Sequence, residues 1–203
     1  MFKHAFAAIA VVVLSATPAL AGPPLICHPF DTESGSLLAW GKGSGWNTPD
    51  PSYDIRRLVA DTTAMLTEDT PVLTRMENLR RATIYVMRDP VVAEQLLKAL
   101  MARALRTTTD AGAWFDAGYV IEAYRQGTHL RSRSASWAAV DETIRVDGYG
   151  FVKKAMAMGG PSPAMEFAAS LMTEGSVAAA HRARAATAGP GSLVVRNLAK
   201  LAY

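Results

Sequence analysis

Residues 70–106, TPVLTRMENLRRATIYVMRDPVVAEQLLKALMARALR, contain two helical patterns, each with its own start signal. Thr70-Pro71 and Asp89-Pro90 each place a capping residue before a proline, which is tolerated at the first helical position because its missing N–H has no intrahelical partner there. In the second pattern the apolar residues form a wide stripe, and Glu94 and Lys98 lie four residues apart outside it. Because the connection is short, the stretch predicts an antiparallel helical hairpin.

Capping residues and apolar spacing predict further helices on both sides of this hairpin. Ser52 is placed to cap the preceding helix, Asp110 and Asp147 to cap two later ones, and Gly127 to end one. A polar loop is expected at 127–136. The expected helices cover residues 53–66, 71–87, 90–106, 110–126, a start near 137, 148–158, 163–173, 176–187 and 192–202. No region alternates with period two for long, so the predicted fold class is all-α.

The N-terminal residues have the pattern of an export signal. Residues 1–21, MFKHAFAAIAVVVLSATPALA, place Lys3 and His4 before an apolar run and end on A-L-A, so a signal peptide with cleavage before Gly22 is predicted. An uncleaved anchor is the alternative, but a membrane crossing needs about 20 apolar residues and this run is shorter. We expect a periplasmic or secreted protein without stable membrane insertion after cleavage.

Residues 22–51 are expected to form an irregular arm, since glycine, proline and serine interrupt them too often for a long helix or strand. The arm carries too many apolar side chains for a free linker, so we expect these to insert into the helical body: Leu25, Ile26, Phe30, Leu37, Leu38, Trp40 and Trp46. Residues 52–203 are then expected to form a single helical domain.

Composition indicates a globular chain rather than a disordered one. The 203 residues are 50% hydrophobic and 19% charged, and loss of Lys3 with the leader lowers the formal net charge from +3 to +2. Such a small excess gives no reason to expect nucleic acid as a partner. Residues 175–203 contain four cations and no acid, which fits either solvated helix faces or an anion-binding surface: Arg182, Arg184, Arg196 and Lys200.

Metal and cofactor motifs are missing from the sequence. One cysteine excludes an internal disulfide, so Cys27 is a buried thiol, a free thiol or one half of an intermolecular disulfide. Cys27-His28 lacks the C-x-x-C-H pattern of haem attachment, and the other histidines are scattered without ligand spacing. The loop GKGSG at 41–45 lacks the residue order of a phosphate-binding loop and is expected to be a flexible connection. No metal and no cofactor are predicted.

The densest group of chemically interesting residues is WFDAGYVIEAYR at 114–125. A helix that is apolar on several sides is usually central, and Gly118 would let a neighbouring helix approach closely. Glu122 would then lie among aromatic rings, where desolvation raises the pKa of a carboxyl unless a cation compensates. Arg80 and Arg81 could supply that cation.

Two interpretations of these residues stay open. In one, a pocket lies between the two helices, where Arg80 or Arg81 grips an anionic group and Glu122 orients it. In the other, the charged side chains neutralise one another without a ligand. The candidate binding residues are Glu77, Arg80, Arg81, Trp114, Asp116, Tyr119, Glu122 and Arg125. No nucleophile motif is present, and no catalytic residue is predicted.

Residues 149–172, YGFVKKAMAMGGPSPAMEFAASLM, resemble a junction between two tetratricopeptide repeats, with Val152, Ala155, Pro163 and Ala168 at the positions for small or apolar residues. The Trp, Leu-Gly and Tyr of the usual first helix are missing, and no period of about 34 residues is visible. The resemblance implies stacked helix pairs with a concave surface that binds a peptide or protein. PPLICHPF and RMENLRR are also similar to exported bacterial helical proteins, a similarity that implies no activity.

Three functions follow as hypotheses. The first is an exported, helical-repeat-like protein that binds a protein or peptide in the cell envelope. The second is a small enzyme or ligand-binding protein that uses the arginine and glutamate pocket. The third is a structural envelope protein whose arm pairs through Cys27.

Overall fold

A computed structural model describes residues 24–33, 35–131, 134–160 and 162–201, and confirms the all-α class: this part of the chain is helical and contains no strand. The α-helices are α1 (Leu58–Met65), α2 (Val72–Val86), α3 (Pro90–Arg106), α4 (Ala111–Gln126), α5 (Ala138–Thr143), α6 (Gly148–Gly159), α7 (Pro163–Ser170), α8 (Gly175–Ala185) and α9 (Leu193–Lys200). Short 3-10 helices cover Ile55–Arg57, Gly127–Leu130, Ala135–Trp137 and Ala186–Ala188. The predicted signal peptide, residues 1–21, and its cleavage point lie outside the described residues.

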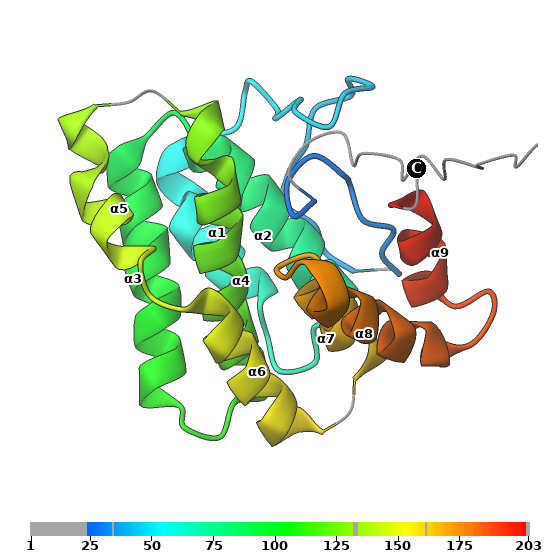
Figure 1. Ribbon diagram of the computed structural model, residues 1–203. Coiled ribbons are helices and arrows are strands. Elements are labelled where there is room, and N and C mark those ends of the chain that lie inside the picture. Colours follow the sequence, from blue (N-terminus) through cyan, green and yellow to red (C-terminus); the bar gives the residue numbers. More distant parts are fainter. Residues whose placement is uncertain (1–23, 34, 132–133, 161, 202–203) are drawn as a thin grey trace, which may run out of the picture.

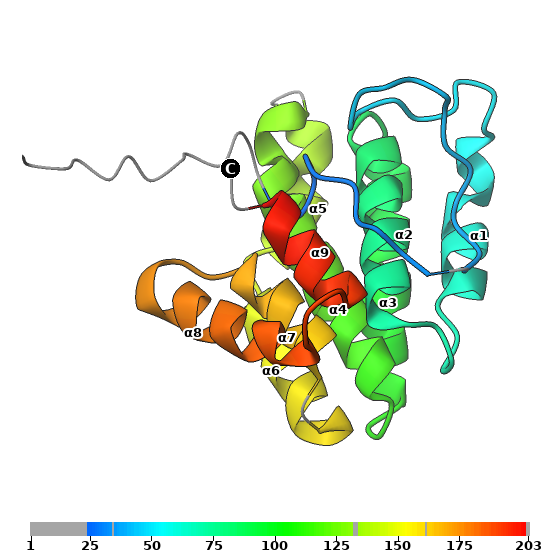
Figure 2. The ribbon, with the colours of Figure 1, turned by 90° about the vertical axis from the view of Figure 1, so that its right-hand side faces the viewer.

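Helix α4 is the centre of the body, as its apolar composition predicted. It contacts α2, α3 and α6, and it lies between the α1–α3 side and the α6–α9 side of the molecule (Figures 1 and 2). All its residues from Ala113 to Tyr124 are buried. Among the described helices, none is both long enough and apolar enough to cross a membrane.

Two glycines set the contact between α4 and α6. A Cβ on Gly118 would lie 2.5 Å from the carbonyl oxygen of Gly148, and a Cβ on Gly148 would lie 2.8 Å from the carbonyl oxygen of Gly118. Each helix therefore occupies the volume that a side chain on the other would need. The close approach predicted at Gly118 is confirmed, and its partner is the first residue of α6.

Aspartates cap three helices as predicted. Asp89 accepts hydrogen bonds from the amides of Val91 and Val92, Asp110 from Ala113, and Asp147 from Gly150. These caps depend only on local sequence, which explains why the starts of α3, α4 and α6 were predictable.

Two predicted caps are wrong. Asp54, not Ser52, accepts from the amide of Arg56 and begins the first helical segment at Ile55. The hydroxyl of Thr70 donates to the Met65 carbonyl and so satisfies the end of α1, while Pro71 itself is the residue before α2. The physical reason is that Thr70 finds its partner in the preceding helix rather than in the following one.

Several predicted boundaries also shift. Residues 127–136 were expected to form an exposed loop, but Gly127–Leu130 is helical and Gly127 is buried. Helix α7 ends at Ser170 rather than 173, and α8 ends at Ala185 before a 3-10 turn. Helix α9 ends at Lys200, and the predicted end at 202 lies outside the described residues.

The arm runs without helix or strand across α2 and beside α9 (Figure 2). Leu25, Ile26, Phe30 and Leu38 are buried, whereas Leu37, Trp40 and Trp46 are half-buried. Backbone amides of the arm donate to side chains of the body: Leu25 to Gln126 (2.9 Å), Phe30 to Glu77 (3.1 Å), Asp31 to Asn197 (2.8 Å) and Leu38 to Asn78 (2.8 Å). The arm is thus held by polar as well as apolar contacts.

Candidate functional site

The structure divides the eight predicted site residues among separate groups. The charged ones form three sets of ion pairs, centred on Glu77, on Asp116 and on Glu122. Arg80 and Arg81 both pair with Glu77 on their own helix, and no contact joins them to Glu122.

Arg80 holds the arm to α2. Its side chain is fully buried; Nε and Nη2 donate to Glu77 (2.8 Å each), and Nη1 donates to the carbonyls of Ile26 (3.2 Å) and Trp46 (3.0 Å). Arg81 donates to Glu77 (2.7 Å) and to the Leu38 carbonyl (2.6 Å). These donors are therefore occupied by the protein's own acceptors, which is the arrangement a buried cation requires.

Asp116 pairs with two arginines that the sequence analysis did not single out. Its Oδ2 accepts from Arg75 at 2.7 Å and from Arg103 at 3.4 Å, and Arg103 also pairs with Asp110. Burial raises the pKa of Asp116 to about 7, against the opposing effect of the two guanidinium groups. Its other oxygen, Oδ1, is buried without a hydrogen-bond partner. The site links α2, α3 and α4, and within it Asp116 and Arg75 are buried.

Glu122 and Arg125 join α4 to the segment before α6. Arg125 Nη1 contacts Glu122 at 2.5 Å, and its Nη2 donates to the carbonyls of Ile144 and Val146 at 2.7 Å. Glu122 also accepts from the amide of Tyr149 at 3.0 Å. Glu122 thus has a cation of its own, as one of the two sequence interpretations required.

The two predicted aromatic residues are packing contacts. Trp114 lies against Phe151, with ring centroids 4.9 Å apart, and the Lys154 ammonium lies 3.4 Å from its ring centroid. Tyr119 is fully buried, donates to the Leu25 carbonyl at 3.3 Å, and has a pKa that burial raises.

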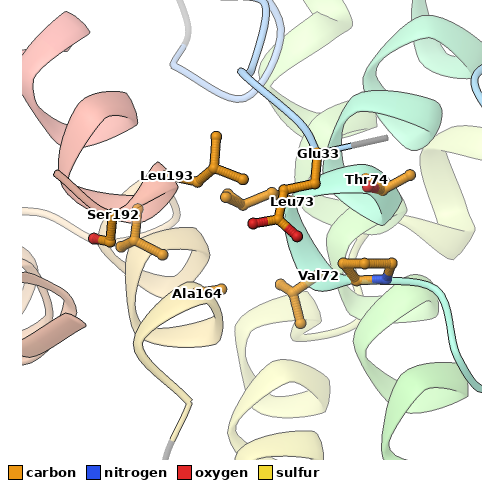
Figure 3. Close-up of a pocket in the computed structure, with 9 residues that line it drawn as sticks. Glu33, Val72, Leu73, Thr74, Ala164, Ser192 and Leu193 are labelled. Carbon is orange, nitrogen blue, oxygen red and sulfur yellow. The ribbon is translucent and has the colours of Figure 1, made fainter. Parts of the chain in front are cut away.

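A groove with a volume of about 250 Å³ lies between the arm, the start of α2, α7 and α9 (Figure 3). Its apolar lining comes from Val72, Leu73, Ala164, Leu193 and Val194. This groove contains none of the predicted site residues, because its lining comes from segments far apart in the sequence.

One carboxylate belongs to this groove. Figure 3 shows Glu33, from the arm, directed into the groove between Leu193 and Val72. Glu33 is exposed, and no cation in the described part of the chain pairs with it. The hydroxyl of Thr74, which also lines the groove, is buried without a partner. The groove can therefore hold an apolar group next to a positive charge.

A second polar network, also not predicted, joins α6, α7 and α8. The Tyr149 hydroxyl contacts His181 Nε2 at 2.7 Å, and His181 Nδ1 contacts Glu166 at 2.5 Å. Arg184 pairs with the other Glu166 oxygen at 2.8 Å. Burial opposes ionisation of Glu166, but the hydrogen bonds from Arg184 and His181 outweigh it and hold its pKa below the usual value. The network holds α8 against its neighbours.

The other candidates from the sequence were Cys27 and the cations of residues 175–203. Cys27 is a free, half-buried thiol whose pKa is raised by burial, with Arg80 acting in the opposite direction. All four cations at the C-terminal end are exposed, and three of them also contact a protein acceptor: Arg184, Arg196 and Lys200. In the described ranges, no three His, Cys, Asp or Glu side chains gather as metal ligands.

Comparison of the chain with protein-family models, with curated proteins and with solved structures finds no match. The function proposed below is therefore based on the geometry of the chain itself.

Proposed function

We propose that this protein binds an extended segment of another protein in the groove between the arm, α2, α7 and α9. The observation that carries the proposal is the apolar groove with the unpaired carboxylate of Glu33 at its edge. An apolar side chain of the partner segment occupies the groove, and a neighbouring lysine or arginine faces Glu33.

The size of the groove favours a side chain over a whole small ligand. Pockets for small molecules usually enclose about 300–1,000 Å³, and this groove is smaller. Burial of one leucine-sized side chain contributes roughly 1.5–3 kcal/mol. The charge at the edge contributes up to about 1 kcal/mol of affinity in water, selects against acidic segments and speeds the encounter with basic ones.

The proposal includes a tetratricopeptide-like arrangement of helix pairs in the cell envelope. Two observations support the helix pairs: α2 and α3 are joined by only residues 87–89, and Val152, Ala155 and Ala168 are buried at the positions that the resemblance requires. The pattern of residues 1–21 supports export. Protein released from the envelope fraction with Gly22 as its first residue would support this location, and an intact Met1 would contradict it.

Selection from a random peptide library on the purified protein tests the binding function. The enriched peptides should place Lys or Arg beside Leu, Ile, Met or Phe. Glu33→Lys should weaken the binding of a selected, fluorescently labelled peptide about tenfold, which is ~1.4 kcal/mol of binding free energy. Replacing the cation of that peptide by Glu should restore its binding to the variant.

Glu142→Lys is the matched control, because Glu142 is an exposed acid on α5, at the other end of the molecule in Figure 1. It should leave the affinity unchanged, whereas Leu193→Ala should reduce it. Selected peptides without a cation, or peptides that bind Glu33→Lys as tightly as the original protein, would contradict the proposal.

A further inference from the structure

A second, larger cavity lies at the other end of α2. It has a volume of about 540 Å³, within the range of roughly 300–1,000 Å³ that is typical of small-molecule sites. The residues that line it come from the glycine-rich part of the arm, from Tyr53 and Ile55, and from the end of α2 up to Arg88. Because α2 spans 15 residues, at about 1.5 Å per residue the cavity and the groove lie about 20 Å apart.

The loop that forms one wall is closed by its own contacts. The Gly41 amide donates to the Thr48 carbonyl at 3.0 Å, and the Thr48 hydroxyl donates to the Gly45 carbonyl at 2.9 Å. A Cβ on Gly41 would lie 2.6 Å from the Thr48 carbonyl oxygen, so only glycine fits there. The segment expected to be a flexible connection therefore forms a defined wall.

The cavity contains charges of both signs. Lys42 and Arg88 line it, both are exposed, and neither pairs with a carboxylate of the described residues. Asp50 lines it as well. The hydroxyl and amide of Ser52 donate to Asp50 Oδ1 and hold the pKa of this carboxyl below its usual value, so it is an anion at neutral pH. Its Oδ2 keeps its lone pairs for a cation.

Beside Asn47 and Thr48, another part of the wall comes from aromatic and aliphatic side chains: Tyr53, Ile55, Ile84 and Tyr85. The Tyr85 hydroxyl donates to the Ala39 carbonyl and accepts from the Asp50 amide, and the Tyr53 hydroxyl donates to Asp61. Since both hydroxyls are engaged, the tyrosines offer the cavity their ring carbons, together with Ile55. The two rings lie 4.8 Å apart and support each other.

From these features we propose that the cavity binds a free α-amino acid with an apolar or aromatic side chain. The carboxylate of the ligand lies at Lys42 and Arg88, its ammonium group at Asp50 Oδ2, and its side chain against Tyr53 and Ile55. A simple anion would meet the charge of Asp50, and a simple amine would meet the two cations, so a ligand with both charges fits best. This site is separate from the peptide groove and does not rest on the function proposed for it.

Isothermal titration of the purified protein with L-phenylalanine and L-leucine tests the proposal. At least one of them should bind, and for L-phenylalanine the analogues that lack one charge, 3-phenylpropanoate and phenethylamine, should bind at least tenfold more weakly. Failure of both amino acids to bind would overturn the proposal. Equal binding of 3-phenylpropanoate or phenethylamine would overturn the role of the opposite charges.

Substitutions then locate the site. Arg88→Ala and Asp50→Asn should each weaken amino-acid binding at least tenfold, and the asparagine keeps an oxygen that can accept from Ser52. Lys98→Ala, an exposed cation on α3, is the control and should leave binding unchanged. Glu33→Lys should also leave amino-acid binding unchanged. Failure of this proposal can therefore be distinguished from failure of the proposal that the groove binds a peptide. Unchanged affinity in Arg88→Ala and Asp50→Asn, with normal thermal unfolding, would place the ligand elsewhere.

Discussion

At the scale of single residues, the crossing of α4 and α6 depends on the absence of two side chains. Gly118→Ala would direct a methyl group at a backbone carbonyl 2.5 Å away, which cannot rotate aside. The helix gains about 1 kcal/mol of propensity from Ala, but overpacking costs about 1–3 kcal/mol, and more where backbone must move. Because backbone must move here, the cost lies at the upper end of that range or above it, so we expect a net loss of at least about 2 kcal/mol in the free energy of unfolding, measured by urea denaturation.

Gly159→Ala, at the other end of α6, is the matched control. Its new Cβ would lie 3.3 Å from the Ala111 methyl group, a contact that a small shift relieves. Its stability should stay within about 1 kcal/mol of the original. Equal stability of Gly118→Ala and the original protein would show that α6 moves away at no cost.

At the scale of helices, α8 is attached by two small apolar residues and one polar network, since its buried residues are Ala178, His181 and Ala185. The folded-state pKa of Glu166 lies below its ordinary value of 4.5, so its contribution to stability is present above that pH and disappears as the pH falls through the folded-state pKa. Glu166→Gln should therefore cost roughly 1–3 kcal/mol at pH 7 and less than that at pH 3.

Urea denaturation of both proteins at the two pH values measures this difference. Glu142→Gln, at a 73%-exposed side chain, should show no comparable change with pH. A cost of Glu166→Gln that is the same at pH 3 and pH 7 would mean that the charge of the carboxylate does not hold α8.

Helices could be predicted from the sequence where residues within the helix itself determine its start or its burial. Asp89, Asp110 and Asp147 cap within their own turn, and the composition of α4 by itself indicated a central helix. A predicted helix start is wrong where the side chain expected to cap that helix forms a hydrogen bond with another element, as Thr70 does with α1. The contact of Glu166 with His181 had no local signal, because 15 residues and a turn separate them.

At the scale of the whole molecule, the fully buried guanidinium of Arg80 joins the arm to the helical body. Arg80→Lys keeps the charge but loses the planar fork that reaches Glu77, Ile26 and Trp46 together. We expect a loss of roughly 1–3 kcal/mol in the free energy of unfolding, because buried acceptors that lose their donor stay unsatisfied.

Hydrogen exchange shows whether this loss begins at the arm. The amides of Phe30 and Leu38, which donate to side chains of α2, should exchange at least tenfold faster in the variant, relative to amides within α4. Arg145→Lys, at a 77%-exposed surface arginine, should change neither the free energy of unfolding nor the exchange of the arm amides. An equal increase in exchange at the arm and α4 would mean that Arg80 stabilises the body as a whole.

The candidate sites could be predicted only in part. The sequence indicated buried charges around Glu77, Asp116 and Glu122 but not their partners, since Arg75 and Arg103 reach Asp116 through tertiary packing. The groove brings together Glu33, Val72 and Leu193, which no local pattern connects. Only the folded chain brings such distant residues to one place.

Two hydrogen bonds between the arm and α9 make the ordering of the arm depend on a distant segment of the chain. The side-chain amide of Asn197 accepts from the Asp31 amide and donates to the Asp31 carbonyl, 166 residues earlier. Contacts between residues so far apart in the sequence form slowly, so the arm completes these hydrogen bonds late in folding. Loss of α9 would therefore leave the amide and the carbonyl of Asp31 without these two partners.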